Sequence, residues 1–417
     1  MAASPNGKLI AYADDLQAIH IVDAEKGLEI KTFKRTETKF SQLAFSADSS
    51  RLAGGGSTES TVRVSIWDLA SGEVDLRLDW PKGRSPNASV EDLEFSPNDE
   101  RLAVAVFNQS QAYLFEANTG KKIAELPHRE IYGLSFGSDG KSLATAGWDS
   151  IVRFWDADSG ELRTEFNVKE QKGAQVEKNA DGTGLENDLR MYTVCFSPNG
   201  DLFATAHMNQ RVNIWNLDDR SHLTTIKVDG LFRYGTMNFS PDGLWLATGI
   251  DGRDPKLSGE VTLWDPRSGD KVWDIGRHHG DVYTVGFGRD SKTLISGGEE
   301  GCCHVWDLVS TKAKSNLDAD WKNLRSADSK TVFQAMQRLT ATPDRTVKLL
   351  KSKLTADGVL TLQSDVEGRR MANLVTSLLT SVRTPDAIRL LKRLANDKKK
   401  PLFQKAAANA LVRLRRS

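Results

Sequence analysis

The sequence predicts a mainly β fold, a seven-bladed β-propeller in residues 1–317, followed by a small all-α domain in residues 318–417. Three observations lead to this prediction. A strand-turn-strand motif recurs along the first part, its copies are about as far apart as four-stranded blades require, and a helical periodicity replaces it near Asp318.

The composition is typical of soluble globular domains, with 39% hydrophobic and 27% charged residues. No apolar run approaches the roughly 20 residues of a membrane helix, and the first residues lack the pattern of a secretion signal. Three cysteines cannot build a disulfide framework, so we expect a cytoplasmic protein.

The net charge of zero is the sum of two parts of opposite charge. Residues 1–317 hold 35 Lys and Arg against 47 Asp and Glu, a net of −12, and residues 318–417 hold 21 against 9, a net of +12.

The recurring motif is a Phe, then Ser or Gly, then any residue, then Asp or Asn, followed by a short apolar run. In every copy the apolar residue that opens the next strand follows the Phe by seven positions, as Leu52 follows Phe45, so one short turn joins the same two strands each time. The leading residues are Phe45, Phe95, Phe136, Phe196, Phe239 and Phe287.

Each copy ends in a strand that carries an aromatic-acidic dipeptide or a related pair. Successive dipeptides are 45, 48, 40, 60, 49 and 42 residues apart, which is close to the ~40–45 residues of a four-stranded blade. The dipeptides are Val22-Asp23, Trp67-Asp68, Phe115-Glu116, Trp155-Asp156, Trp215-Asn216, Trp264-Asp265 and Trp306-Asp307.

These repeats resemble those of the WD40 family of β-propellers, and the resemblance covers residues 4 to about 317. It implies blades arranged in a closed ring, which protects the sheet edges. It also implies a non-catalytic scaffold that binds a protein or peptide partner.

The first copy begins too close to Met1 to form a whole blade. Counting back seven positions from Ile10 places Ala3 where the Phe of the innermost strand belongs. We therefore expect blade one to lack its innermost strand. Two explanations stay open: Met1 lies inside a longer protein, or the ring closes irregularly.

The WD40 resemblance implies a structural hydrogen-bond network of His, Ser or Thr, Asp and Trp in some blades. In blade seven, Glu300 replaces the Asp. The matching residues are His128, Thr145, Asp149 and Trp155 in blade four, and His278, Ser296 and Trp306 in blade seven.

Insertions are expected on one face of the ring. The connections from first to second strand and from third to fourth strand are tight turns such as SPDG and DSGE. The other connections carry the extra residues, at 57–61, 81–89, 169–190 and 251–259, and they share the face called the top in this family. Loops that elaborate one face of a rigid scaffold commonly carry its function.

The resemblance also places particular side chains on that top face, rich in the Tyr, Trp and Arg that dominate binding hot spots. We expect a partner-binding surface centred on blades four and five, with packing between blades as the alternative role of the aromatic residues. The predicted binding residues are Glu130, Tyr132, Trp148, Arg190, Tyr192, Met208, Arg233, Asp281, Tyr283 and Glu299.

The basic last hundred residues show helical periodicity, and TPDRTVKLLK at 342–351 recurs as TPDAIRLLK at 384–392. Helices are predicted near 327–341, 343–355, 365–380, 385–396 and 401–415, with Pro343 and Pro385 at first helical positions. This segment resembles HEAT-like helical pairs, and propellers followed by such a segment resemble a group of bacterial proteins. Two such pairs bury little surface, so the helices should dock on the propeller near the last blade.

Chemical motifs are sparse. The basic residues at 398–400, 413, 415 and 416 raise the alternative of contact with nucleic acid or anionic lipid. Aromatic residues that could stack on bases are almost absent in this segment, which makes nucleic acid an unlikely partner. Gly54-Gly55-Gly56 has no following Lys, so it is not a phosphate loop. His278, His279, Cys302, Cys303 and His304 invite a zinc hypothesis, but adjacent strand residues face opposite sides and no second Cys pair is present.

We therefore predict neither metal nor cofactor, no membrane span and no enzymatic activity. The alternative function is that of a regulatory or sensor module of a larger protein, whose catalytic or membrane part would lie upstream of Met1.

Overall fold

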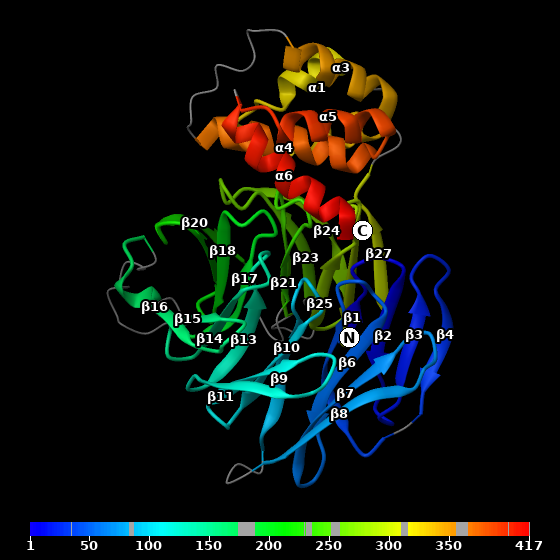
Figure 1. Cartoon of the computed structure of the whole chain (residues 1–417), viewed down its shortest axis with the longest axis vertical. Coiled ribbons are helices and arrows are strands. Elements are labelled where there is room, and N and C mark those ends of the chain that lie inside the picture. The colour runs from blue at the N-terminus through cyan, green and yellow to red at the C-terminus, as the bar shows by residue number, and fades with distance from the viewer. Residues whose placement is uncertain are drawn as a thin grey trace.

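The computed structural model describes residues 1–34, 36–82, 87–173, 188–228, 230, 236–251, 259–309, 316–355, 366–398 and 400–416. Their strands form seven antiparallel sheets, and the helices gather on one side of them (Figure 1). The fold is the predicted one, a mainly β, seven-bladed propeller followed by C-terminal helices.

The first three blades each have four strands in sequence order. Their strands are β1 (Ala2–Ala3), β2 (Leu9–Ala13), β3 (Ile19–Asp23) and β4 (Leu28–Phe33) in blade one; β5 (Lys39–Phe45), β6 (Arg51–Ser57), β7 (Thr61–Asp68) and β8 (Val74–Pro81) in blade two; and β9 (Ser89–Phe95), β10 (Arg101–Phe107), β11 (Gln111–Glu116) and β12 (Lys122–Pro127) in blade three.

Blades four to six repeat this order, and blade seven has three strands among the described residues. Their strands are β13 (Ile131–Phe136), β14 (Ser142–Gly147), β15 (Ile151–Asp156) and β16 (Leu162–Asn167), which the short 3₁₀ helix η1 (Val168–Glu170) follows; β17 (Met191–Phe196), β18 (Leu202–His207), β19 (Arg211–Asn216) and β20 (His222–Lys227); β21 (Met237–Phe239), β22 (Leu246–Gly249), β23 (Gly259–Trp264) and β24 (Lys271–His278); and β25 (Val282–Phe287), β26 (Thr293–Gly298) and β27 (Cys303–Asp307).

The register of the inner hairpins follows from the turn chemistry of the repeated motif. Phe45 pairs with Leu52 and Phe287 pairs with Leu294, the seven-position offset seen in the sequence. In blade two, the Ser46 hydroxyl donates to Asp48 at 2.7 Å and accepts the backbone N–H of Arg51 at 2.9 Å. A Ser side chain that bonds both within and across the turn favours one turn geometry, and so one register.

Blade one requires a correction. Its innermost strand is not missing but is reduced to two residues, β1, in which Ala3 pairs with Ile10. This is the same seven-position offset, with Ala3 in place of the Phe. β1 contacts β25 of blade seven and β5 of blade two, so it closes the ring, and the argument from a missing strand no longer applies.

Six helices follow the propeller, and five lie where the sequence predicts them. The additional helix is α1, which begins at Leu317, one residue before the expected boundary. They are α1 (Leu317–Asn323), α2 (Ser329–Thr340), α3 (Pro343–Thr355), α4 (Val366–Val382), α5 (Pro385–Ala395) and α6 (Pro401–Arg416). None of the helices in the described part of the chain has the length and apolar character to cross a bilayer.

The helices share one hydrophobic cluster with blades six and seven, so they have no separate core. Phe333 of α2 packs edge-on against Trp245 of blade six, with ring centroids 5.1 Å apart, and also contacts Trp273 of β24. In Figure 1 the helices form one group above β21 to β27.

Polar contacts fix which face of the propeller the helices cover. Ser377 of α4 donates to Asp242 at 2.5 Å, Arg370 pairs with Asp265 at 3.1 Å, and Asn409 of α6 donates to the backbone carbonyl of Asn199 at 3.2 Å. Asp242 and Asn199 lie in first-to-second turns and Asp265 in a third-to-fourth turn. We call the face with these tight turns, which the helices cover, the lower face, although Figure 1 draws the helices uppermost. The opposite face, the one predicted as the top, is called the upper face.

Candidate functional site

The upper-face residues predicted for blades four, five and seven occupy equivalent places. In each blade, the backbone N–H of the residue after the second strand donates to the carbonyl of the residue that precedes the first strand. Trp148 donates to Glu130 at 3.1 Å, Met208 to Arg190 at 2.9 Å and Glu299 to Asp281 at 2.9 Å.

A close backbone approach sets this geometry in blade four. Glu130 has a positive φ of 51°, in the left-handed region. A Cβ at Gly147 would lie 2.6 Å from the Glu130 carbonyl oxygen, so only glycine lets β14 end this close to the loop before β13. The two chain segments therefore present Tyr132 and Trp148 side by side.

Four aromatic side chains from blades three, four and five form an aromatic cluster on the upper face: Phe107, Tyr132, Trp148 and Tyr192. Tyr132 and Trp148 stack with centroids 4.7 Å apart, Phe107 lies 4.9 Å from Tyr132, and Tyr192 meets Tyr132 edge-on at 5.6 Å. All four are half-buried. Sequence reasoning missed Phe107. Its signal is its place in the repeat: Phe107 follows Phe95 by twelve positions, just as Trp148 follows Phe136.

Arg190 covers one side of the cluster. Its guanidinium lies 4.8 Å from the centroid of the Trp148 ring, a cation–π contact. The same guanidinium donates to Asp188, at 2.9 Å from Nε and 2.6 Å from Nη2, and this ion pair lowers the pKa of the Asp188 carboxyl although partial burial opposes it. Desolvation raises the pKa of Tyr132. The cluster thus combines apolar ring faces with a pre-positioned cation.

The remaining predicted residues are not part of this cluster. Asp281, Tyr283 and Glu299 lie on blade seven, and Tyr283 is 37% exposed. Met208 lies next to Arg190 through the backbone hydrogen bond, without a described contact to the aromatic rings. Arg233 lies outside the described residues.

The predicted network residues of blade four are hydrogen-bonded to one another. The buried His128 lies with Nδ1 2.7 Å from the Thr145 hydroxyl and Nε2 3.2 Å from Asp149, and the Trp155 indole N–H donates to Thr145 at 2.9 Å. Desolvation lowers the pKa of His128, and the neighbouring His128 and Arg153 hold the pKa of Asp149 at about 2. Every ring nitrogen is engaged, as a structural network requires.

Blades five and seven build the network differently. In blade seven, His278 lies 2.7 Å from Ser296 and 2.6 Å from Glu300, and Trp306 donates to Ser296. In blade five, which lacks the His before its first strand, His207 from the end of β18 lies 2.8 Å from Thr205. Burial lowers the pKa of His207 to about 4.

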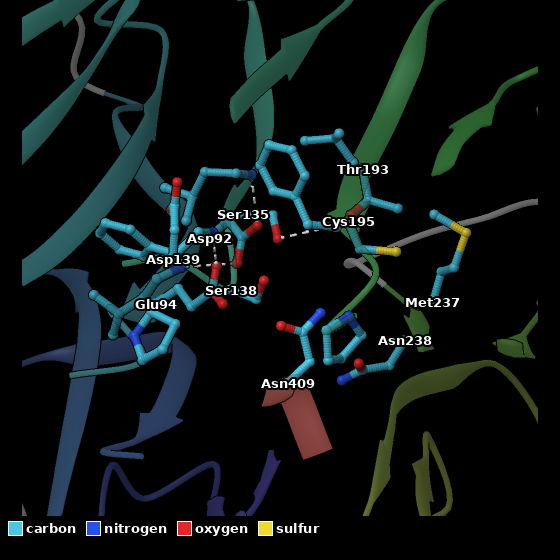
Figure 2. A pocket seen from close by; sticks show the side chains of 17 residues that line it. Asp92, Glu94, Ser135, Ser138, Asp139, Thr193, Cys195, Met237, Asn238 and Asn409 are labelled. Atoms are coloured by element: carbon cyan, nitrogen blue, oxygen red, sulfur yellow. Dashed lines mark hydrogen bonds between the residues drawn. The ribbon is translucent and has the colours of Figure 1, made fainter. Parts of the chain in front are cut away.

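A cavity of about 660 Å³ lies between the innermost strands of blades three to six and is shown in Figure 2. Asp92 and Glu94 of β9, Ser135 of β13 and Cys195 of β17 point toward it, and Asn409 of α6 approaches it from the helices. Asp92 accepts the backbone N–H of Leu134 at 2.8 Å, and Glu94 accepts that of Phe136 at 2.9 Å.

These two carboxyls are shifted strongly by burial. Desolvation raises the pKa of Asp92 to about 6, and desolvation with the neighbouring Asp92 raises the pKa of Glu94 to about 8. Both accept backbone N–H groups from the adjacent blade, so they join blades three and four. The two carboxyls therefore have a structural role in the contact between these blades.

A known protein family matches this chain at three of the same repeats. The family model described as "WD domain, G-beta repeat" matches residues 120–156, 186–216 and 269–307. Each match ends on the second residue of a dipeptide noted in the sequence, at Asp156, Asn216 and Asp307.

Curated relatives are distant and eukaryotic. Target of rapamycin complex subunit LST8 of Mus musculus is 28% identical over 174 residues, 41% of this chain and 46% of the relative. Actin-interacting protein 1-2 of Arabidopsis thaliana is 23% identical over 281 residues, 66% of this chain and 41% of the relative. Actin-interacting protein 1 of Drosophila melanogaster is 20% identical over 354 residues, which are 74% of this chain and 54% of the relative. The chain spans about half the length of these relatives. The chain thus carries WD40 repeats in the three matched segments, and its sheets form a seven-bladed β-propeller.

Proposed function

We propose that the chain is a non-catalytic scaffold that binds a protein or peptide through the upper face, centred on blades four and five. The observation that carries this proposal is the aromatic cluster with Arg190 beside it, because such residues bury large area at modest entropic cost. The names of the relatives, a complex subunit and actin-interacting proteins, are those of proteins that bind other proteins.

The position of the helices on the lower face also supports the upper face as the binding surface. They cover the lower face at blades five and six through Asn199, Asp242 and Asp265, so a partner there would compete with the chain's own helices. Of the insertions predicted for the other end of the blades, residues 57–61 connect the second and third strands of blade two at the upper face. Residues 83–86, 174–187 and 252–258 of the other insertions lie outside the described residues.

Packing between blades is the competing role of the cluster, and the structure indicates how to separate the two. Tyr132 and Trp148 stack on each other, so truncating either one removes packing as well as binding surface. Arg190 is the better probe, because its side chain is 38% exposed and its ion pair with Asp188 is worth ~0–1 kcal/mol to folding.

The experiment is affinity capture with mass spectrometry, followed by quantitative binding of the identified partner to the full chain. We expect Arg190→Ala to weaken binding by at least ~1 kcal/mol, about fivefold, and the triple change of Trp148, Arg190 and Tyr192 to Ala to abolish it. The melting temperature of Arg190→Ala should stay unchanged.

Leu162→Ala is the matched control, since Leu162 is 47% exposed on β16 at the outer edge of blade four. It should bind as well as the unchanged protein. If the triple variant keeps its affinity, or loses stability in parallel with affinity, the cluster has a packing role and the proposal fails. In this proposal the protein acts in the cytoplasm, where its three thiols stay reduced.

A further inference from the structure

Three potential metal ligands meet at the upper end of blade seven. His278 ends β24, Glu300 lies in the turn between β26 and β27, and His304 lies on β27. Their ligand atoms all lie within 4.8 Å of one another, with His278 Nδ1 2.6 Å and His304 Nε2 3.9 Å from the same Glu300 oxygen. We call these three residues the blade-seven triad.

Blade four shows what the same three positions contain in an ordinary network. There the residues are His128, Asp149 and Arg153, and the Arg153 guanidinium donates to Asp149 at 2.7 Å. Arg153 is a permanent cation that neutralises the carboxylate. In blade seven the carboxylate is one methylene longer and His304 replaces the arginine, so an imidazole, which can bind a metal ion, stands where blade four has a fixed positive charge.

The Glu300 carboxylate has an incomplete set of partners. Its Oε2 atom is buried and has no hydrogen-bond partner among the described residues, while its Oε1 atom lies against His278. An unpaired buried carboxylate oxygen costs free energy, and a bound cation removes that cost.

The three ligand atoms lie within 4.8 Å of one another, close enough to converge on a tetrahedral dication. Two ligand atoms ~2.0–2.1 Å from a tetrahedral zinc ion are about 3.3 Å apart, which falls between the separations of 2.6 and 3.9 Å seen here. Two imidazoles and one carboxylate form a common zinc ligand set.

The surroundings of the triad provide the second requirement of a zinc site. When Nδ1 of a histidine binds a metal, its Nε2–H needs an acceptor that orients the ring. The Ser296 hydroxyl lies 2.7 Å from His278 Nε2 and also receives the Trp306 indole N–H at 2.8 Å. His278 is fully buried, whereas the His304 side chain is 38% exposed and leaves a path to solvent.

We propose that His278, Glu300 and His304 bind Zn²⁺, with water as the fourth ligand. This site differs from the cysteine-containing one that the sequence suggests and that we rejected. Cys303 points to the other side of β27, where its sulfur lies 3.3 Å from that of Met1. The ion would join β24 of blade six to the β26–β27 hairpin of blade seven, next to the place where β1 closes the ring.

The test is calorimetric titration of the chelator-treated full chain with Zn²⁺, together with the visible spectrum after Co²⁺ replaces it. We expect one ion per chain and a tetrahedral cobalt spectrum. His304→Arg should weaken binding by at least ~tenfold and still fold, because it recreates the arrangement of blade four, and Glu300→Gln should do the same.

His20→Gln is the matched control. His20 also lies between two carboxylates, 3.1 Å from Asp14 and 2.7 Å from Glu29, but on blade one. It should leave Zn²⁺ affinity unchanged. Failure to bind Zn²⁺, undiminished binding by folded His304→Arg, or equal loss in His20→Gln would each overturn the proposal. If His304→Arg does not fold, the double variant Glu300→Asp with His304→Arg, which reproduces blade four completely, replaces it with the same expectation.

Discussion

The lower and upper faces of the propeller use the same repeats in different ways. At the lower face, the turn acids of blade six are buried under helices, where Asp242 accepts from Ser377 and Asp265 pairs with Arg370. In blade two, Asp48 occupies the same turn position as Asp242 but is exposed. At the upper face, the aromatic cluster packs within itself and no described helix covers it. The same turn acid that fixes the strand register thus also binds a helix in blade six, where an apolar surface lies beside the turn.

The largest effect is expected at the lower face. Phe333→Ala should reduce the free energy of unfolding by about 3–5 kcal/mol, because Phe333 is buried between the rings of Trp245 and Trp273. Chemical denaturation followed by Trp fluorescence measures this loss. Tyr283→Ala, a change of an exposed aromatic on the upper face, should cost less than ~1 kcal/mol. Similar losses for the two variants would show that the helices contribute little to the propeller.

A smaller effect on stability should distinguish a turn acid that also binds a helix from one that only stabilises its own turn. Asp242→Ala removes the acceptor of Ser240, of the backbone N–H of Leu244 and of Ser377, and we expect a loss of about 2–3 kcal/mol. Asp48→Ala removes the turn bonds alone and should cost about 1 kcal/mol. Equal losses in thermal denaturation would mean that the contact with Ser377 adds nothing.

The smallest effect concerns the cavity between the innermost strands. The pKa of Glu94 is raised from 4.5 to about 8 in the folded chain, so its favourable contribution is complete below pH 4.5 and is lost as the pH rises through 8. Glu94→Gln stays neutral and can still accept the N–H of Phe136. It should stabilise the protein by on the order of 1–2 kcal/mol at pH 9 and hardly at pH 5. A stability difference that does not change with pH would contradict this.

The sequence was sufficient for features that depend on local spacing. The seven-position offset from Phe45 to Leu52 gives the register of each inner hairpin, and Pro385 after Thr384 marks the start of α5. The pairing of Glu130 with Trp148 and of Arg190 with Met208 also follows from position within the repeat. The partner-binding role of these residues stays a prediction.

Features that depend on contacts between distant segments were missed or misjudged. The offset was correct for Ala3, but nothing local showed that two residues can close the ring between β5 and β25. Phe107 reaches the aromatic cluster from another blade, and Glu300 gains interest only beside His304. Docking of the helices was expected, but not its contacts, in which an apolar cluster that includes Trp245 and Phe333 lies beside the ion pair of Arg370 with Asp265.

The attachment of the helices to two adjacent blades has a mechanical consequence. The chain continues from β27 of blade seven to α1, and side chains of the helices contact Asp242 and Asp265 of blade six. A pull on the C-terminal helices would therefore be shared between blades six and seven.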